Sequence, residues 1–323
     1  EFRDIDYLPD TGSKRVLTTG GHFGYLKIAE GCDKHCTYCI IPKLRGKFRS
    51  VPMERLVAQA EDMAEQGVKE LILVAQETTV YGKDLYGKKS LHILLKKLCE
   101  IRGIRWIRVL YCYPEEIYDE LIETIRDEKK ICHYLDIPIQ HASDRILKRM
   151  GRRTSKQELI DIVGKLRKEI PDIVLRTTLI TGFPGETEED HEELKEFVDE
   201  MEFDRLGVFT YSPEENTPAA EMADQVPEEV KEERRDELME LQQEISYDRG
   251  QDRIGQELLV MIEGKVADES AYIGRTYGDA PKVDGYIFVQ TGELLMTGDF
   301  AKVRVTGALE YDLIGVLSDE YTE

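Results

Sequence analysis

The sequence has no uninterrupted apolar run near the roughly 20 residues that a helix needs to cross a bilayer. Its first residues, EFRDIDYLPDTGSKRVL, are polar and mixed in charge, unlike a secretory leader. We therefore expect a soluble, cytoplasmic protein with no membrane partner. With 323 residues, of which 41% are hydrophobic, the chain is long enough for one large domain and a smaller one.

Cysteine is scarce, and its distribution does not suit a disulfide framework, which is typical of small secreted domains. Of the six cysteines, three lie within eight residues of one another. The other three are scattered through apolar segments, where we interpret them as small buried residues: Cys99, Cys112 and Cys132.

Basic residues are outnumbered, 44 against 65 acidic residues, so the formal net charge is −21. A surface of this sign repels phosphate backbones and favours basic partners. Acidity that only maintains solubility is the alternative explanation.

Apolar, β-branched runs alternate with amphipathic stretches along most of the chain. Six runs predict buried strands, at 23–30, 68–76, 104–111, 134–140, 172–182 and 204–211. Helical patterns separate them, including 52–66, 91–100 and a long charged stretch at 227–248. Strands that alternate with helices predict an α/β fold with a parallel sheet, open or closed.

The pattern changes near residue 250. From there to the end, short β-rich runs such as ELLVMIEG, YIFVQT, FAKVRVTGAL and DLIGVL alternate with Gly, Asp and Pro turns. This predicts a small antiparallel barrel of about five strands. We therefore divide the chain into domains at 1–249 and 250–323. The tail carries 14 acidic and 6 basic residues, a net charge of −8.

The stretch AEGCDKHCTYCIIP holds three cysteines but no fourth to close a metal site: Cys32, Cys36 and Cys39. A structural zinc site normally has four protein ligands, and His35 is the obvious fourth. However, His35 adjoins Cys36, and adjacent residues seldom both reach one tetrahedral ion. An iron–sulfur cube held by three thiolates is the other possibility, because one iron then stays open for an outside ligand. Gly31 gives the backbone freedom to wrap such a cluster.

With the aromatic Tyr38 before the last cysteine, this loop resembles the C-x3-C-x2-C signature of radical S-adenosylmethionine (SAM) enzymes. The resemblance implies a partial (β/α)6 TIM-like barrel and a catalytic 4Fe–4S cluster bound by Cys32, Cys36 and Cys39. SAM would bind the fourth iron through its amino and carboxylate groups. One electron would then split the sulfonium and release a deoxyadenosyl radical that abstracts a hydrogen atom. Tyr38 would pack against the base of the ligand. The protein holds the cofactors, excludes water and aims the radical.

Polar residues at two predicted strand ends suit SAM contacts, because barrel enzymes place their chemistry at the carboxyl ends of strands. AQET ends the second strand, where the superfamily often binds the SAM amino group, and this implies Gln76 or Glu77. PIQHAS ends the fourth and offers Gln140 and Ser143 for the ribose or the methionyl part. Each segment is also compatible with an ordinary βα turn.

A third such segment, LRTTLITGFPGET, ends the fifth strand. Here Arg176 is the candidate partner of the SAM carboxylate, and Gly182 would let the backbone approach the adenine. The glycine-rich element of the superfamily is imperfect, because Thr178 takes its first glycine position. An ordinary turn again remains the alternative.

Nearly the whole chain resembles one branch of the superfamily, the methylthiotransferases. The resemblance rests on YLKIAEGCDKHCTYCIIPKLRGKFRS, YLDIPIQHASDRILKRMGRR, TTLITGFPGETEED and GVFTYSPEENTPAA, and the tail stretch GRTYGDAPKVDG is similar to a TRAM domain. Members modify tRNA adenosines (MiaB-like and MtaB-like) or an aspartate of the twelfth small-subunit ribosomal protein (RimO-like). PIQHAS and VFTYSPEENTPAA are closer to the last pattern.

The charge of the tail also favours the ribosomal protein as substrate. A TRAM domain that binds RNA should neutralise phosphates with Lys and Arg, but this tail is acidic and better matches a basic protein loop. We therefore expect a basic ribosomal-protein partner, free or within the small subunit, and consider tRNA less favoured. The resemblance also implies an electron donor such as flavodoxin or ferredoxin. A non-catalytic binding protein stapled by a metal loop is the alternative from another class.

The family normally begins with a further domain whose three cysteines hold a second 4Fe–4S cluster. Here 31 residues precede Cys32, and they contain no cysteine. We expect this sequence to lack that domain, so that it cleaves SAM without completing methylthiolation.

Overall fold

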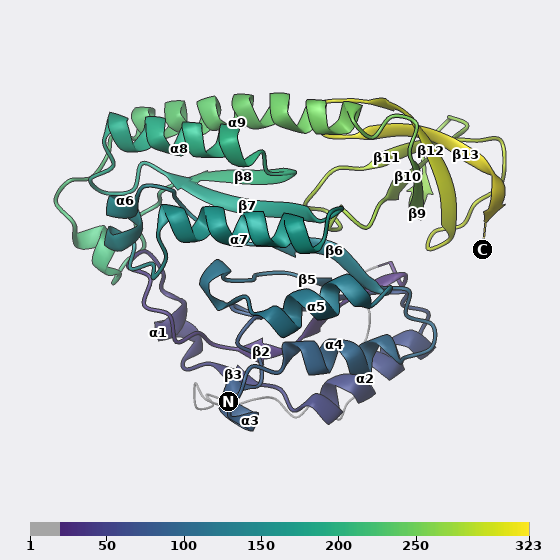
Figure 1. Ribbon diagram of the computed structural model, residues 1–323, viewed down its shortest axis with the longest axis horizontal. Helices are drawn as coiled ribbons and strands as arrows, with labels where there is room; N and C mark the ends of the chain where they lie inside the picture. Colours follow the sequence, from purple (N-terminus) through teal and green to yellow (C-terminus); the bar gives the residue numbers. More distant parts are fainter. Residues whose placement is uncertain (1–19, 323) are drawn as a thin grey trace.

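The computed structural model describes residues 20–322, and its larger part is an α/β layer built on six parallel strands (Figure 1). The strands follow one another in the sheet in chain order, each hydrogen-bonded to the next. A strand lies at or near each of the six predicted runs: β1 (Phe23–Lys27), β4 (Glu70–Val74), β5 (Trp106–Val109), β6 (Ile131–Asp136), β7 (Val174–Thr181) and β8 (Arg205–Thr210). The fourth begins three residues before its predicted range and ends four residues before the end of that range. The sheet is open, as the partial barrel requires.

Helices between the strands cover the outer face of the sheet: α2 (Met53–Glu65), α4 (Leu91–Cys99), α5 (Asp119–Asp127), α7 (Lys156–Glu169), α8 (Glu188–Met201) and α9 (Glu228–Gln251). Two of them begin with a capping box, in which a side chain and the third helical residue satisfy each other's backbone N–H groups. Ser155 pairs with Glu158 at α7, and Thr187 pairs with Asp190 at α8. Shorter helical segments complete the layer: α1 (Ile41–Arg45), α3 (Lys83–Tyr86), α6 (Asp144–Arg149), η1 (Pro114–Glu116) and η2 (Pro218–Glu221).

The main core lies between the sheet and these helices, because successive strand residues point to opposite faces. On β7, Leu175 and Leu179 belong to this core. Val174, one position earlier, joins a second cluster on the other face, and Arg176 is on the same side as Val174. The inner face is therefore partly apolar and partly charged. None of the helices within residues 20–322 is long and apolar enough to cross a membrane.

The tail forms a closed five-stranded barrel in the order β10-β11-β13-β12-β9. Its strands are β9 (Glu257–Lys265), β10 (Ala271–Arg275), β11 (Ile287–Gln290), β12 (Phe300–Ala308) and β13 (Leu313–Thr322). Most pairs are antiparallel, as expected, whereas β11 and β13 run parallel. Residues such as Val260, Ile287 and Val303 fill the barrel interior.

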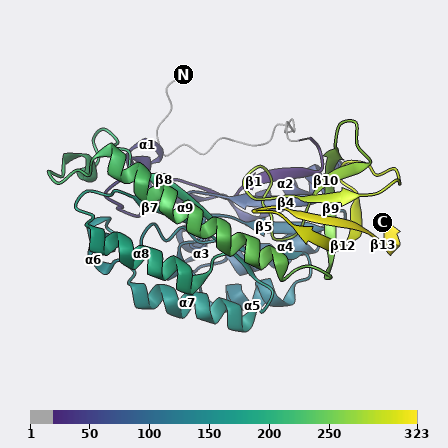
Figure 2. The ribbon, with the colours of Figure 1, turned by 90° about the horizontal axis from the view of Figure 1, so that it is seen from above.

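The barrel is fixed against the inner face of the sheet by charged residues that are completely buried. Glu70 at the start of β4 accepts from Arg275 of the barrel at 2.6 Å and from Arg108 of β5 at 2.8 Å. Beside them, Arg205 of β8 pairs with Asp279 of the β10–β11 loop at 2.6 Å. These contacts involve residues near the amino ends of the strands. Two views place the barrel at one end of the molecule and α1 at the other (Figures 1 and 2).

Candidate active site

The cysteine loop lies near the carboxyl end of β1, between a short strand, β2, and α1. The run expected as one strand over 23–30 divides, because β1 ends at Lys27 and β2 (Ala29–Glu30) pairs instead with β3 (Arg49–Ser50). Gly31 follows with φ of +80°, and a Cβ there would lie 2.1 Å from the carbonyl oxygen of Lys47. Only glycine suits this position, since the backbone is left-handed and crowded at once.

Hydrogen bonds close the loop on itself and on the neighbouring strand end. The Cys32 N–H donates to Gly46 O at 3.2 Å, and the Cys39 N–H donates to Cys36 O at 3.1 Å. The Gly31 N–H donates to the side-chain oxygen of Gln76 at 2.9 Å. Gln76 therefore ties the end of β4 to the loop, and its amide oxygen keeps a second lone pair for another donor.

Cys32 and Cys36 are buried, Cys39 is half-buried, and all three are free thiols. Burial raises the pKa of Cys32 to about 11, although the Lys34 N–H, 3.4 Å from its sulfur, opposes the shift. Burial also raises the pKa of Cys39. Thiolates are the species that bind metal, and buried thiols ionise readily only when a cation replaces the proton. This donor set therefore fits an iron–sulfur cluster.

Within the described part of the chain, no three His, Cys, Asp or Glu side chains converge as ligands of a single metal ion do. The proposed fourth zinc ligand, His35, has an exposed side chain. A cube-shaped cluster makes a different demand, because each thiolate binds a different iron. An exposed His35 does not suit a closed structural zinc site.

Two residues that the sequence analysis did not single out line the loop, Tyr113 and Arg152. The Tyr113 hydroxyl lies 3.6 Å from the sulfur of Cys36. The Arg152 guanidinium stacks over the Tyr113 ring at 4.2 Å and is completely buried. Its Nη2 donates to Pro138 O at 3.1 Å, whereas Nε and Nη1 have no hydrogen-bond partner. Glu115 lies 3.6 Å from the guanidinium and shares its positive charge with the surroundings of Cys36. No local sequence signal marks Arg152.

Tyr38 packs against an apolar cluster beside the loop. Its ring meets Phe183 edge-on, with centroids 6.4 Å apart, beside the apolar cluster that includes Met150 and Tyr211. Burial raises the pKa of Tyr38 well above the ordinary range, so it remains a neutral phenol. Packing against the base of a ligand stays a prediction.

Glu77 is the candidate whose surroundings suit a SAM amino group best. One carboxylate oxygen accepts from the Thr79 N–H at 2.9 Å and from the Thr79 hydroxyl. The other oxygen is buried and has no partner. Burial raises the pKa of Glu77 to about 7, against which the hydrogen bonds from Thr79 act. An unpartnered buried carboxylate oxygen is well suited to accept from an ammonium group.

The two residues predicted at the end of β6, Gln140 and Ser143, have different surroundings. Gln140 has φ of +74°, and its backbone is bound on both sides to β7, through Thr178 O at 2.9 Å and the Ile180 N–H at 2.8 Å. A strained, doubly anchored residue is typical of a functional site. Ser143 is buried, and its hydroxyl donates to Asp190 of α8 at 2.7 Å. That bond gives Ser143 a structural role.

Arg176 and Gly182 on β7 also have structural partners. Arg176 pairs with Asp136 at 2.8 Å and with Asp284 of the barrel at 3.4 Å, so two carboxylates already compensate its charge. Gly182 has φ of +67°, and a Cβ there would lie 2.1 Å from the side chain of Lys231 on α9. The packing of α9 thus explains this glycine.

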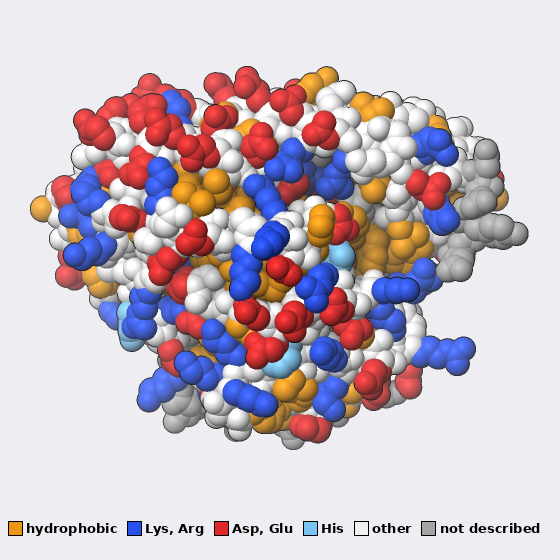
Figure 3. Space-filling view, in the orientation of Figure 1, with side chains coloured by type: hydrophobic (Ala, Val, Ile, Leu, Met, Phe, Trp, Pro, Cys, Tyr) orange, Lys and Arg blue, Asp and Glu red, His pale blue; other side chains and the backbone are white. Residues whose placement is uncertain are grey.

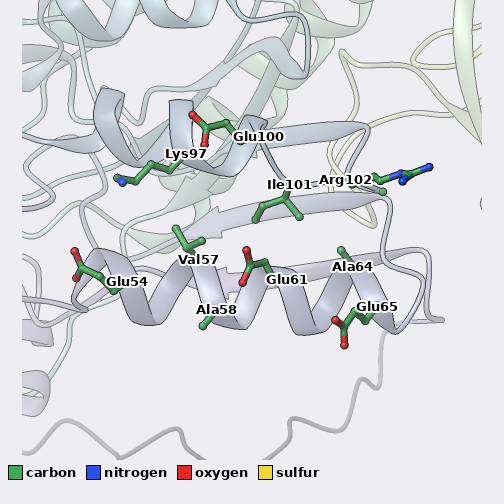
Figure 4. A pocket seen from close by; sticks show the side chains of 11 residues that line it. Glu54, Val57, Ala58, Glu61, Ala64, Glu65, Lys97, Glu100, Ile101 and Arg102 are labelled. Carbon is green, nitrogen blue, oxygen red and sulfur yellow. The ribbon is translucent and has the colours of Figure 1, made fainter.

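The structure therefore brings the cysteines together with Gln76 and Glu77, and Arg176 is held by carboxylates of both domains. A separate hollow lies between α2 and α4 (Figure 4), lined by side chains of mixed charge such as Glu61, Glu100 and Lys97. It is on the outer helical layer and shares no residue with the cysteine loop.

Two family models match the chain. The model of the Radical SAM superfamily matches residues 26–198, and that of the TRAM domain matches residues 254–317. The chain is 67% identical over 314 residues to the ribosomal protein uS12 methylthiotransferase RimO of Lachnoclostridium phytofermentans, covering 97% of this chain and 71% of that protein. It is 56% identical over 306 residues to RimO of Clostridium perfringens (strain 13 / Type A), covering 95% and 68%.

Solved structures share the fold at low sequence identity. Coproporphyrinogen III oxidase (HemN) from Escherichia coli, a radical SAM enzyme, aligns with a TM-score of 0.55 at 16% identity, over 87% of this chain and 66% of that one. The radical SAM methyltransferase TsrM from Kitasatospora setae aligns with a TM-score of 0.52 at 16% identity, over 61% and 38%. These likenesses show the fold alone.

Proposed function

This chain belongs to the radical SAM superfamily and, within it, to the ribosomal protein uS12 methylthiotransferases, and we propose that it carries out the SAM-cleaving, hydrogen-abstracting part of the methylthiolation of an aspartate of uS12. The observation that carries the proposal is the loop of three cysteines beside Glu77, at the carboxyl end of the sheet. When bound, the 4Fe–4S cluster and SAM supply a carbon radical that removes hydrogen from an unactivated carbon. Reductive cleavage of SAM is the property that a metal-stapled binding module would lack.

The residues of this chain hold and orient those groups. Cys32, Cys36 and Cys39 bind the cluster, and Glu77 accepts from the SAM amino group through its unpartnered oxygen. Gln140 faces the ribose or methionyl part. Arg152 shares its positive charge between Glu115 and the surroundings of Cys36. Among the other predicted SAM contacts, Tyr38, Gln76, Ser143, Arg176 and Gly182, each has a structural contact that explains it without the cofactor.

We propose that the acidic tail binds the basic ribosomal protein, and we consider tRNA a less favoured partner. Three of its acids have arginine partners: Glu263 pairs with Arg275 at 2.6 Å, and the buried Asp279 and Asp284 pair with arginines of the sheet. The remaining acids exceed the remaining basic residues of the tail. A substrate of this kind implies a cytoplasmic protein, and the division at 249/250 is supported by α9 ending at Gln251.

The second 4Fe–4S cluster and the electron donor, flavodoxin or ferredoxin, also remain proposals. The scattered cysteines do not suit that cluster as ligands. Burial raises the pKa of Cys99 and Cys132 to about 12 and that of Cys112 further, and burial of a free thiol without a cation disfavours the thiolate.

The proposal is tested by anaerobic incubation of the iron-reconstituted protein with SAM, reductant and purified uS12. We expect deoxyadenosine and methionine in equal amounts and association with uS12. Association with tRNA that weakens steeply with salt, and none with uS12, would instead support the tRNA-modifying branch. Cys36→Ala should keep the far-UV circular dichroism of the parent and abolish SAM cleavage. If the metal only staples the fold, Cys36→Ala should instead unfold the domain, because the metal-binding energy is then folding energy.

A further inference from the structure

Cys36 differs from Cys32 in the kind of group that faces its sulfur. The backbone N–H of Lys34 lies 3.4 Å from the sulfur of Cys32. The sulfur of Cys36 instead has a side-chain hydroxyl beside it, that of Tyr113 at 3.6 Å. A side-chain donor can be removed by substitution while the backbone stays in place, so its effect on a bound cluster can be measured.

The Tyr113 hydroxyl is a donor with one acceptor in reach. Burial raises the pKa of Tyr113 well above its ordinary value, so the phenol keeps its proton. Within residues 20–322 this hydroxyl has no other hydrogen-bond partner. A thiol is a weak acceptor, whereas a thiolate is a strong one. The O–H group is therefore fully satisfied only when Cys36 is ionised, as it is when it binds a metal.

The position of the Tyr113 ring is set by the end of β5 and not by the cysteine loop. Just before it, the Cys112 N–H donates to Asp136 O at 2.8 Å. Just after it, the buried Pro114 begins η1, and the Glu116 N–H donates to the Tyr113 carbonyl oxygen at 3.0 Å. The backbone is thus held on both sides of the tyrosine.

Two cations lie over the Tyr113 ring, the Arg152 guanidinium at 4.2 Å and the Lys34 ammonium at 5.0 Å. Both have acids beside them: Lys34 pairs with Glu116 at 2.6 Å, and Glu115 lies 3.6 Å from Arg152. These acids hold the cations in place and leave little net charge. Cations over a ring attract its π electrons, which makes the O–H group a stronger donor.

Most of the remaining charge of the chain lies at its surface. The formal net charge is −21, and Asp and Glu side chains crowd the top of the molecule over α8 and α9 (Figure 3). A negative protein disfavours the addition of an electron, but salt screens exposed charges beyond about 8–10 Å. Groups that contact the cysteine sulfurs therefore have more influence on a bound cluster than these distant acids.

We propose that Tyr113 is a positioning residue that makes the cluster easier to reduce, because its hydroxyl donates to the Cys36 thiolate and raises the reduction potential. The inference rests on the proposed function, in which one electron must enter the site before SAM is cleaved. An added electron increases the negative charge on the cluster and its ligand sulfurs. A donor to one of these sulfurs therefore stabilises the reduced state more than the oxidised state.

The test is Tyr113→Phe, which keeps the ring and its cation contacts and removes only the O–H group. The iron-reconstituted protein is titrated anaerobically, and the reduced cluster is followed by electron paramagnetic resonance. The equilibrium constant for one-electron reduction should be about tenfold smaller than in the parent, a shift of about 59 mV to more negative potential. Incorporation of 3-fluorotyrosine in place of Tyr113 supplies a stronger donor and should shift the potential in the opposite direction.

The matched control is Tyr118→Phe. Tyr118 is half-buried like Tyr113 and has Lys89 over its ring at 5.5 Å, but its hydroxyl bonds to His92 at 2.9 Å and not to a cysteine. The potential of this variant should equal that of the parent. If Tyr113→Phe binds less iron than the parent, the fluorotyrosine substitution decides the question, since it keeps the hydroxyl.

A second phenol, that of Tyr38, also lies beside Cys36, so Tyr38→Phe is titrated in parallel. It should shift the potential less, because the 3.6 Å contact with the sulfur is made by Tyr113. Equal potentials in Tyr113→Phe and the parent, at equal iron content, would overturn the proposal. The proposal would also be overturned if Tyr38→Phe showed the whole shift.

SAM cleavage gives an independent readout. Tyr113→Phe should cleave SAM more slowly than the parent with dithionite and should recover with titanium(III) citrate, a stronger reductant. A variant that stays slow with both reductants would indicate a purely structural role for Tyr113 and would contradict the proposal. Failure of the proposed function is recognisable separately, because neither reductant would then drive SAM cleavage in the parent.

Discussion

Replacing Glu70 by glutamine should separate the barrel from the sheet more than any change of similar size on the surface. Both oxygens of Glu70 bind guanidinium groups, from Arg275 at 2.6 Å and Arg108 at 2.8 Å, and all three side chains are completely buried. Removing one partner of a buried ion pair costs about 3–5 kcal/mol, since a charge is left uncompensated. Here Arg108 loses its only carboxylate partner, and Arg275 keeps Glu263 alone, so we expect Glu70→Gln to reach this range.

The only tryptophan of the chain reports on this interface directly. Trp106 of β5 is buried, and its ring meets Phe300 of the barrel edge-on at 4.9 Å. Urea unfolding followed by Trp106 fluorescence should show the predicted loss. The control Glu169→Gln removes an exposed pair with Arg126 and should leave the transition almost unchanged. A loss below about 1 kcal/mol for Glu70→Gln would refute the reasoning.

The same variant has a pH signature. Burial alone would raise the pKa of Glu70, but the charges of Arg275 and Arg108 outweigh burial and lower the pKa below its ordinary value. A lowered pKa contributes stability above the unfolded-state value of about 4.3, and that stability is lost as pH falls through the folded-state pKa. The advantage of the parent over Glu70→Gln should therefore shrink in acid.

Three further changes test the site. Gly31→Ala should lower the iron bound per chain on reconstitution, because its φ is +80° and its Cβ would meet a carbonyl at 2.1 Å; Gly67→Ala, with φ of +97° and open space, should not. Glu77→Gln should remove a pH dependence of the melting temperature of the metal-free protein. Because burial raises the pKa of Glu77 to about 7, the melting temperature of the parent should fall as pH rises from about 4.3 to 7. The melting temperature of the variant should not fall in this way. Arg176→Gln should lower the melting temperature, because Asp136 loses its ion pair, yet change the dissociation constant of SAM less than Glu77→Gln does; a larger change would restore Arg176 as the carboxylate ligand.

The strands of the sheet could be predicted from sequence because they are apolar runs separated by helical patterns. Even β8, an edge strand whose residues are mostly half-buried or exposed, follows this pattern. The exception is instructive: the run over 23–30 divides at Ile28, whose N–H still donates to β4 while the next residues pair with β3. That change of partner depends on a strand 20 residues away. In the tail, β10 was not among the predicted β-rich runs, because its five residues include two small ones and an arginine.

The site was predicted where its residues are contiguous and missed where they are not. The cysteine spacing is a local pattern, so Cys32, Cys36 and Cys39 could be named. Tyr113 and Arg152 reach the loop from distant segments, and nothing local distinguishes Arg152 from the arginines around it. Competition between functional and structural partners is also invisible in sequence, as the ion pairs of Arg176 with both domains show.

The most direct test is anaerobic iron–sulfur reconstitution of this chain, followed by iron analysis and electron paramagnetic resonance of the reduced sample with and without SAM. With one coordination position left open by three cysteines, the protein should bind about four irons per chain, and SAM should change the spectrum. Stoichiometric zinc in place of iron, or a spectrum that SAM leaves unaltered, would contradict the account.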